Sequence, residues 1–141
     1  MHASYPTNWR VVSVGLIYKD NQVLLGLRYP KADKKNRWEF PGGSIEKGEL
    51  PQETIHRELR EELEITVEKS ELANCLCDYK QNQPYIIVFY HILKWSGSPK
   101  KTCHQKLKWF SLEECNQQQL PNINPHLFMP IYKTLKEKLK S

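Results

Sequence analysis

GGSIEKGELPQETIHRELREELEI, residues 42–65, combines a glycine pair, a short acidic loop and a helical pattern. Ile55, Leu59 and Leu63 recur at i, i+4 and i+8, which predicts a helix with one buried edge. Pro51 suits the first turn of this helix, because its missing N–H group needs no partner there. The opposite side of the helix is left for charged residues.

Three carboxylates share that other side. Glu58, Glu61 and Glu62 fall within an arc of roughly 100° on the predicted helix. Like charges one turn apart destabilise a helix by roughly 0.2–0.5 kcal/mol per pair, unless a cation joins them. Oxygen ligands of this kind suit a hard divalent ion such as magnesium. The alternative is a solvated helix face on which Arg57 and Glu61 form an ion pair.

The spacing of this stretch resembles the Nudix box: Gly43, five residues, Glu49, seven residues, and then RELREELEI at residues 57–65. One position departs from the box, where Glu64 replaces the usual glycine. The resemblance covers roughly residues 9–138. It implies an α/β protein with the Nudix fold, a mixed β-sheet sandwiched between helices (an α/β/α sandwich). It also implies a hydrolase of nucleoside diphosphates linked to a further group.

The resemblance further implies a Mg²⁺ site, with Mn²⁺ as an alternative ion, at these box positions: Gly43, Glu49, Glu58, Glu61 and Glu62. Glu58 and Glu62 would be the principal ligands, and Gly43 would contribute its carbonyl oxygen. Glu49 would bind a second metal ion or orient the helix. Arg57 would hold the box carboxylates by charge-assisted hydrogen bonds.

The resemblance does not by itself identify the general base of the reaction. Residues 79–112 contain no Asp or Glu, although several Nudix enzymes place a further carboxylate just before the last strand. Lys108 stands at the matching position, and His104 lies nearby in the sequence. We therefore predict that Glu61 is the base and that Glu58 and Arg57 complete the catalytic group. His104 is the alternative base, although a lone loop histidine is more often a surface residue.

Within the family, the run WEFPGG at residues 38–43 most resembles the MutT type. Those enzymes hydrolyse oxidised dGTP to the monophosphate and pyrophosphate, and so clean the nucleotide pool and serve DNA repair. Arg28 occupies the position of an arginine that meets the nucleotide phosphate, and Glu39 is a further candidate for substrate binding.

Asn124 occupies the position of an asparagine that contacts the purine edge, and its amide offers both a donor and an acceptor. It could equally be a helix N-cap before Pro125. Residues 79–84 lack the arginine that covers the base in the best-known members. Tyr79 or Tyr85 would then stack on the base instead.

Other functions remain open at this point. CTP-type pyrimidine nucleotides are an alternative substrate, and so are RNA 5′ ends, the single nucleic-acid partner considered. Residues 71–141 hold 10 basic and 5 acidic side chains, against 11 of each in residues 1–70. This basic excess would attract polyanions or simply keep the surface soluble. A module that binds nucleotides without cleaving them is an alternative from another class.

The composition, 39% hydrophobic and 26% charged over 141 residues, is typical of one globular domain. We expect a single Nudix domain over residues 1–141, as a monomer or homodimer that acts on a small-molecule nucleotide. No apolar run approaches the roughly 20 residues of a membrane span, so no membrane partner is expected. Residues 1–6 lack a signal-peptide pattern, which predicts a cytoplasmic location.

The remaining elements follow from periodicity and turn residues. Strands are expected at residues 9–18, 23–28, 72–78, 85–95 and 107–110, with turns at 19–22 and 79–84. A helix is expected to begin at Ser111, and a last helix to span residues 125–140. The four cysteines match no zinc spacing, and Cys75 or Cys77 is a candidate for the core.

Overall fold

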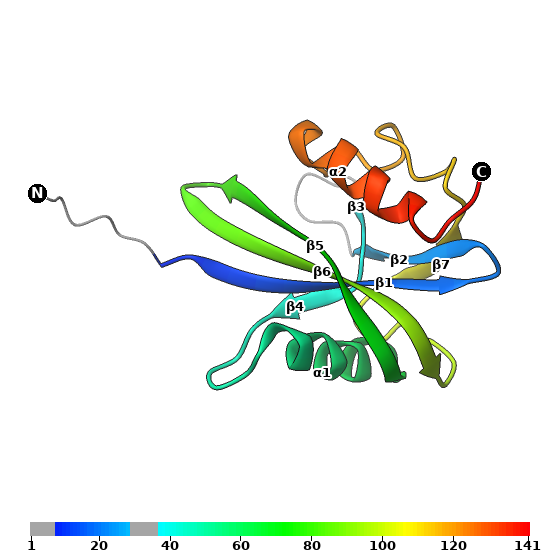
Figure 1. Ribbon diagram of the computed structural model, residues 1–141, viewed down its shortest axis with the longest axis horizontal. Helices are drawn as coiled ribbons and strands as arrows, with labels where there is room; N and C mark the ends of the chain where they lie inside the picture. The colour runs from blue at the N-terminus through cyan, green and yellow to red at the C-terminus, as the bar shows by residue number, and fades with distance from the viewer. Residues whose placement is uncertain (1–7, 29–36) are drawn as a thin grey trace, which may run out of the picture.

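A mixed β-sheet lies between two helices in the computed structural model, which describes residues 8–28 and 37–141. Helix α1 (Pro51–Leu63) covers one face and α2 (Pro125–Lys136) the other (Figure 1). This is the predicted α/β/α sandwich. Residues 1–6, used above to predict the location, lie outside the described ranges. No described helix is long and apolar enough to cross a membrane.

The sheet of the described residues is built around β1. Its strands are β1 (Arg10–Lys19), β2 (Gln22–Arg28), β3 (Arg37–Glu39), β4 (Gly42–Ser44), β5 (Thr66–Lys80), β6 (Gln83–Ser96) and β7 (Lys106–Phe110). Their order is β3-β2-β1-β6-β5, with β4 paired to β1 and β7 to β2. Strand β1 runs parallel to β6 and antiparallel to β2 and β4.

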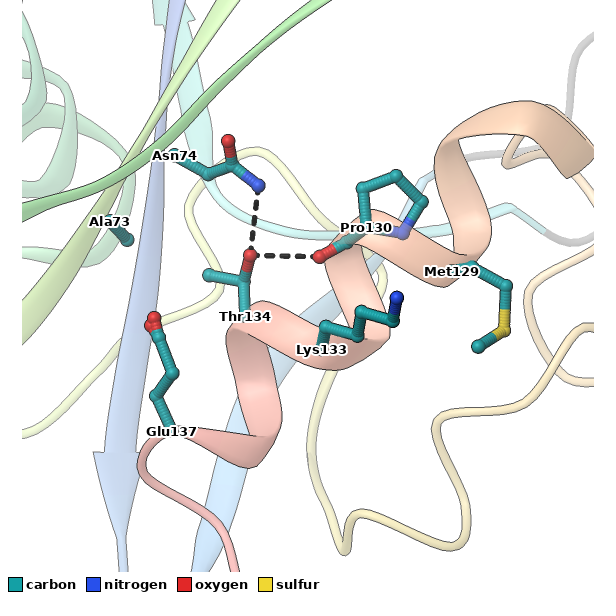
Figure 2. Close-up of a pocket in the computed structure, with 7 residues that line it drawn as sticks. All are labelled: Ala73, Asn74, Met129, Pro130, Lys133, Thr134 and Glu137. Carbon is teal, nitrogen blue, oxygen red and sulfur yellow. Dashed lines mark hydrogen bonds between the residues drawn. The ribbon is translucent and has the colours of Figure 1, made fainter.

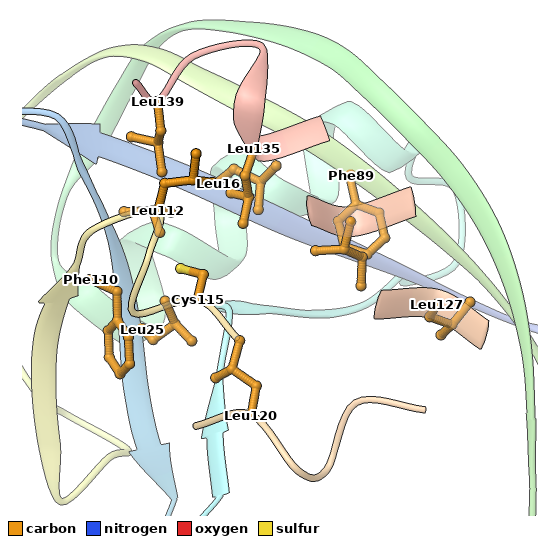
Figure 3. Packing of buried hydrophobic residues seen from close by; sticks show 12 residues of the cluster. Leu16, Leu25, Phe89, Phe110, Leu112, Cys115, Leu120, Leu127, Leu135 and Leu139 are labelled. Atoms are coloured by element: carbon orange, nitrogen blue, oxygen red, sulfur yellow. The ribbon is translucent and has the colours of Figure 1, made fainter. Parts of the chain in front are cut away.

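A helix covers each face of the sheet, and successive side chains of a strand point to opposite faces. Each central strand therefore contributes residues to two hydrophobic clusters. In β1, Leu16 packs in the cluster under α2, whereas Ile17 packs in the cluster under α1. In β2, Leu25 likewise packs in the cluster under α2, and Leu24 packs in the cluster under α1. Figure 3 shows the α2 side, where Leu16, Leu25 and Phe89 of the sheet meet Leu127, Leu135 and Leu139.

Two hairpins have the same kind of turn. Asp20 and Asn21 have φ of 50° and 60°, and Gln81 and Asn82 have φ of 49° and 64°. Two consecutive residues with positive φ match the twist of antiparallel strands. The predicted β1–β2 hairpin is therefore confirmed. The second turn is shorter than predicted, and β5 begins before residue 72, because β5 pairs with β6 from Thr66 onward.

The helix predicted to begin at Ser111 is wrong. Ser111 and Glu114 do exchange the two hydrogen bonds of a capping box, at 3.0 and 3.2 Å. Turns follow instead of a helix, because side chains bind the local backbone: the side-chain Oδ1 of Asn116 accepts a hydrogen bond from the N–H of Gln119 at 2.9 Å. The last helix also ends earlier than expected, at Lys136.

The cysteine prediction is wrong as well. Cys75 and Cys77 are both exposed on the edge strand β5, and Cys115 is the buried thiol. Spacing correctly placed the first two on one face, but it could not show that this face is open to solvent.

Candidate active site

Helix α1 is fixed at both ends. At its start, the Glu53 carboxylate accepts the N–H of Leu50 at 2.8 Å, and the Ser13 hydroxyl donates to the Pro51 carbonyl at 2.7 Å. At its end, Glu64 adopts a left-handed conformation, with φ 57° and ψ 35°. This explains why a glycine would suit that position. The last residue of α1 is Leu63.

Arg57 organises one end of the carboxylate group. Its guanidinium lies 2.7 and 3.0 Å from the two oxygens of Glu49, 2.8 Å from Glu58 and 3.2 Å from Glu61. Hydrogen bonds from Arg57 and then Thr54 lower the pKa of Glu49 to about 2. Of the two roles expected for Glu49, this geometry favours orienting the helix. The Arg57–Glu61 ion pair expected for a solvated helix face is present, but Arg57 also binds Glu49 and Glu58.

Glu62 lies at the other end of the group in a different environment. The N–H of Gly42 donates to its Oε2 at 3.0 Å, and the Cys103 thiol lies 3.7 Å from its Oε1. No described lysine or arginine pairs with it. Burial, followed by repulsion from Glu58, raises the pKa of Glu62 to about 7. A half-buried carboxylate without a paired cation fits a metal ligand.

Gly43 brings the backbone into this group. A Cβ atom at position 43 would lie 2.3 Å from the Glu58 carboxyl carbon, so only glycine lets that carboxylate lie against β4. Glu58, Glu62 and the backbone of Gly43 are therefore adjacent. Such an all-oxygen group is suited to a hard divalent ion, as the sequence predicts.

A pocket of about 370 Å³ adjoins the carboxylate group at Gly43. Its polar side chains are Arg28, Glu39, Ser44, Asp78, Lys80 and Tyr85. The structure thus brings the predicted substrate residues Arg28, Glu39 and Tyr85 together beside the box. Tyr79 points away, with 63% of its surface exposed, and it is not among the lining residues.

Asp78 is a candidate that the sequence analysis missed. It is buried, and its Oδ1 accepts a hydrogen bond from the Asn124 amide at 2.7 Å. The Asn124 side chain makes no capping bond to α2, so it is committed to Asp78 and not to the helix start. A signal did exist: Asp78 lies two residues after Leu76, on the inward-facing side of the strand.

Glu39 links the pocket to the loop before β7. Its two oxygens lie 2.7 Å from Arg28 Nε and 3.0 Å from His104 Nε2. Although burial favours its neutral form, hydrogen bonds from His104 and Arg28 hold the pKa of Glu39 below its usual value. His104 is 1% exposed, so the expectation of a surface histidine is wrong. Lys108 instead pairs with Glu114 at 3.4 Å, on the outside.

The sequence pattern of the NUDIX domain matches residues 8–129, most of the chain. The chain belongs to the Nudix family. It is therefore a hydrolase of a family that uses divalent metal ions.

Two relatives of this Nudix hydrolase come from Escherichia coli (strain K12). An 8-oxo-dGTP diphosphatase is 33% identical over 115 residues, which cover 80% of this chain and 88% of the relative. A CTP pyrophosphohydrolase is 31% identical over 109 residues, which cover 77% and 81%. The crystal structure of a MutT NUDIX hydrolase from Burkholderia pseudomallei superposes with a TM-score of 0.72 at 25% identity, covering 89% of this chain and 96% of that one. The predicted Nudix fold is confirmed.

A second pocket of this Nudix domain, about 490 Å³, lies between β5 and α2 (Figure 2). Thr134 accepts a hydrogen bond from the Asn74 amide at 3.0 Å and donates one to the Pro130 carbonyl at 2.8 Å. These contacts hold the part of α2 that follows Pro130 against the sheet. None of the box residues lines this pocket.

Proposed function

We propose that the chain is a Mg²⁺-dependent pyrophosphohydrolase that converts a nucleoside triphosphate to its monophosphate and pyrophosphate, with oxidised dGTP as the preferred substrate. The observation that carries this proposal is one continuous pocket. Its lining includes Gly42 and Gly43, which contact the box carboxylates Glu62 and Glu58, and it also includes Asp78, which accepts a hydrogen bond from Asn124. A nucleotide bound there would place its phosphates at the metal ligands and its base at Asp78.

The box residues would act on the phosphates of the bound nucleotide. Glu58, Glu62 and the Gly43 carbonyl would hold the metal ion, which polarises phosphoryl oxygens and lowers the pKa of bound water when present. Arg57 keeps Glu49 and Glu58 in place. Glu61, whose side chain is 59% exposed, accepts the proton of the attacking water. His104 is the alternative acceptor, because it is buried beside the box.

The base end of the pocket favours guanine-type bases over cytosine. An ionised carboxylate only accepts hydrogen bonds, and guanine offers Asp78 two adjacent N–H donors, whereas cytosine offers one amino group. The Asn124 amide nitrogen already donates to Asp78, which leaves its carbonyl oxygen for an N–H group of an oxidised purine. Tyr85 lines the same pocket and can stack on the ring.

The test is pyrophosphate release from oxidised dGTP, dGTP, CTP and triphosphorylated RNA, with Mg²⁺ and after its removal by EDTA. We expect oxidised dGTP to have the highest kcat/KM and EDTA to abolish turnover. Asp78→Asn and Asn124→Ala should each lower kcat/KM for oxidised dGTP by about 10- to 100-fold, with little change for CTP. Equal losses on all four substrates would contradict base recognition by this pair.

The general base is tested separately with Glu61→Gln and His104→Asn. A kcat loss of about 10²-fold or more in Glu61→Gln alone supports Glu61. If Glu61→Gln retains most of its activity while His104→Asn does not, the assignment passes to His104.

This proposal includes the wider setting of the enzyme. The whole chain, residues 1–141, would act as a single Nudix domain in the cytoplasm, where it removes oxidised nucleotides before DNA synthesis. The family match over residues 8–129 supports the domain assignment.

A further inference from the structure

A second kind of metal-ligand group adjoins the box. Glu62 of α1 and the neighbouring Cys103 and His104 bring their ligand atoms within 4.8 Å of one another. The Cys103 sulfur lies 3.7 Å from Glu62 Oε1 and 3.6 Å from His104 Nδ1. The sequence spacing of the cysteines gave no indication of this group, because Glu62 comes from a distant part of the chain.

The loop that carries the two residues is tied down on both sides. The Thr102 hydroxyl donates to the Glu62 carbonyl, and the N–H of Lys100 donates to the Leu63 carbonyl at 2.9 Å. On the other side, the N–H of Gln105 donates to the Leu27 carbonyl at 2.9 Å. These bonds hold the loop between the end of α1 and strand β2, so the group is preformed.

His104 is held in the orientation that a metal ligand needs. Its Nε2 lies 3.0 Å from Glu39 Oε2, and because a carboxylate only accepts, Nε2 carries the hydrogen. Nδ1 therefore presents its lone pair to the Cys103 sulfur. The ring fits here because Gly26 has no side chain: a Cβ there would lie 2.6 Å from the imidazole. Carboxylate–histidine pairs of this kind orient metal-binding histidines in many proteins.

The distances match a tetrahedral zinc site. With Zn–S of about 2.3 Å and Zn–N or Zn–O of about 2.0–2.1 Å, tetrahedral angles place the ligand atoms about 3.5–3.6 Å apart. The two observed sulfur distances, 3.6 Å to nitrogen and 3.7 Å to oxygen, fit this spacing, and the third pair of ligand atoms, from Glu62 and His104, lies within 4.8 Å. A thiolate and an imidazole select a borderline-soft ion over magnesium.

We propose that Cys103, His104 and Glu62 bind Zn²⁺, with Glu39 as the residue that positions His104. The fourth position faces solvent beside the exposed Cys103 and is open to water. On binding, the thiol loses its proton to solvent and the sulfur becomes a zinc ligand. Because Glu62 is also the predicted magnesium ligand, zinc withdraws it from the box and inhibits hydrolysis. This last consequence rests on the proposed function, whereas zinc binding itself does not.

The first experiment measures binding without activity. The metal-free full-length protein is titrated with Co²⁺, which gives tetrahedral visible bands and a near-ultraviolet thiolate band when a cysteine is a ligand. Zn²⁺ is then added to displace it. We expect one equivalent with a thiolate band, lost in Cys103→Ser, and Zn²⁺ affinity lower by about tenfold or more in that variant. Cys77→Ser, which removes another exposed thiol, is the matched control and should behave as wild type.

A thiolate band that survives in Cys103→Ser, or equal Zn²⁺ affinity in both proteins, overturns the site. The second experiment adds Zn²⁺ to the magnesium-supported reaction, with each protein compared to its own rate without zinc. Half-inhibition should need about tenfold more Zn²⁺ in Cys103→Ser than in wild type or Cys77→Ser. If no nucleotide is hydrolysed, the proposed function fails, but the cobalt and zinc titrations still decide the site.

Discussion

The two ends of the box carboxylate group differ in how their charge is balanced. At one end, Glu49 is bound by Arg57 through two hydrogen bonds, and its pKa is lowered to about 2. At the other end, Glu62 is half-buried beside Glu58, no described lysine or arginine pairs with it, and its pKa is raised to about 7. Both residues belong to the same short motif.

This difference separates a structural role from a binding role. The Arg57 end is electrostatically satisfied by the chain itself, so it fixes the geometry of the helix and loop. The charge at the Glu62 end is not balanced by the chain, so we expect ionised Glu62 to destabilise the metal-free protein and a bound cation to offset that cost. Substitutions at the two ends should therefore change stability with opposite signs.

Arg57→Ala should give the largest effect. Removing the guanidinium leaves the Glu49 and Glu58 carboxylates without their cation, so the variant should unfold at a clearly lower urea concentration than wild type. Urea unfolding of the metal-free protein at pH 8 measures the loss. Arg60→Ala, on the exposed side of the same helix, is the control and should change stability by less than about 0.5 kcal/mol.

Glu62→Gln should have the opposite sign. Glutamine keeps an acceptor for the N–H of Gly42 and removes the charge that burial disfavours. A shift from 4.5 to about 7 corresponds to about 3 kcal/mol at 1.36 kcal/mol per unit. The variant should be more stable than wild type at pH 8 without metal, yet lose turnover by about a hundredfold or more. A destabilised variant would refute the idea that Glu62 awaits a cation.

The pH dependence of that difference sharpens the comparison. Because the folded pKa of Glu62 is raised, its favourable contribution is fully present below the unfolded value of 4.5 and is lost as the pH rises through about 7. The stability gap between wild type and Glu62→Gln should therefore shrink by roughly 2 kcal/mol from pH 8 to pH 5. Thermal unfolding in EDTA across this range measures it. A gap that does not vary with pH would contradict the assignment.

Glu64→Gly should give the smallest effect. Glu64 has a positive φ of 57° at the end of α1, a conformation that costs a non-glycine residue about 1 kcal/mol. Glycine should stabilise the protein by roughly 0.5 kcal/mol after its greater freedom in the unfolded chain is counted, with turnover unchanged. Glu68→Gly, a matched change in strand β5, should destabilise instead.

Local patterns account for the parts of the fold that the sequence predicted. The 3.6-residue period of Ile55, Leu59 and Leu63 placed α1 and its carboxylate face, and the polar turn at Asp20 and Asn21 placed the first hairpin. These features depend on residues a few positions apart, so periodicity and turn chemistry determine them. The failed helix at Ser111 shows the limit, because its capping box forms although no helix follows.

The sequence by itself determined the family, the box helix and the carboxylates that we propose as metal ligands. The tertiary structure decided which other side chains join them. Asp78 meets Asn124 across 46 positions, Cys103 meets Glu62 across 41, and His104 meets Glu39 across 65. These meetings depend on strand register and on how the loop before β7 binds the end of α1. Strand register and the position of this loop leave no local pattern in the sequence, because both are set by the packing of the whole chain.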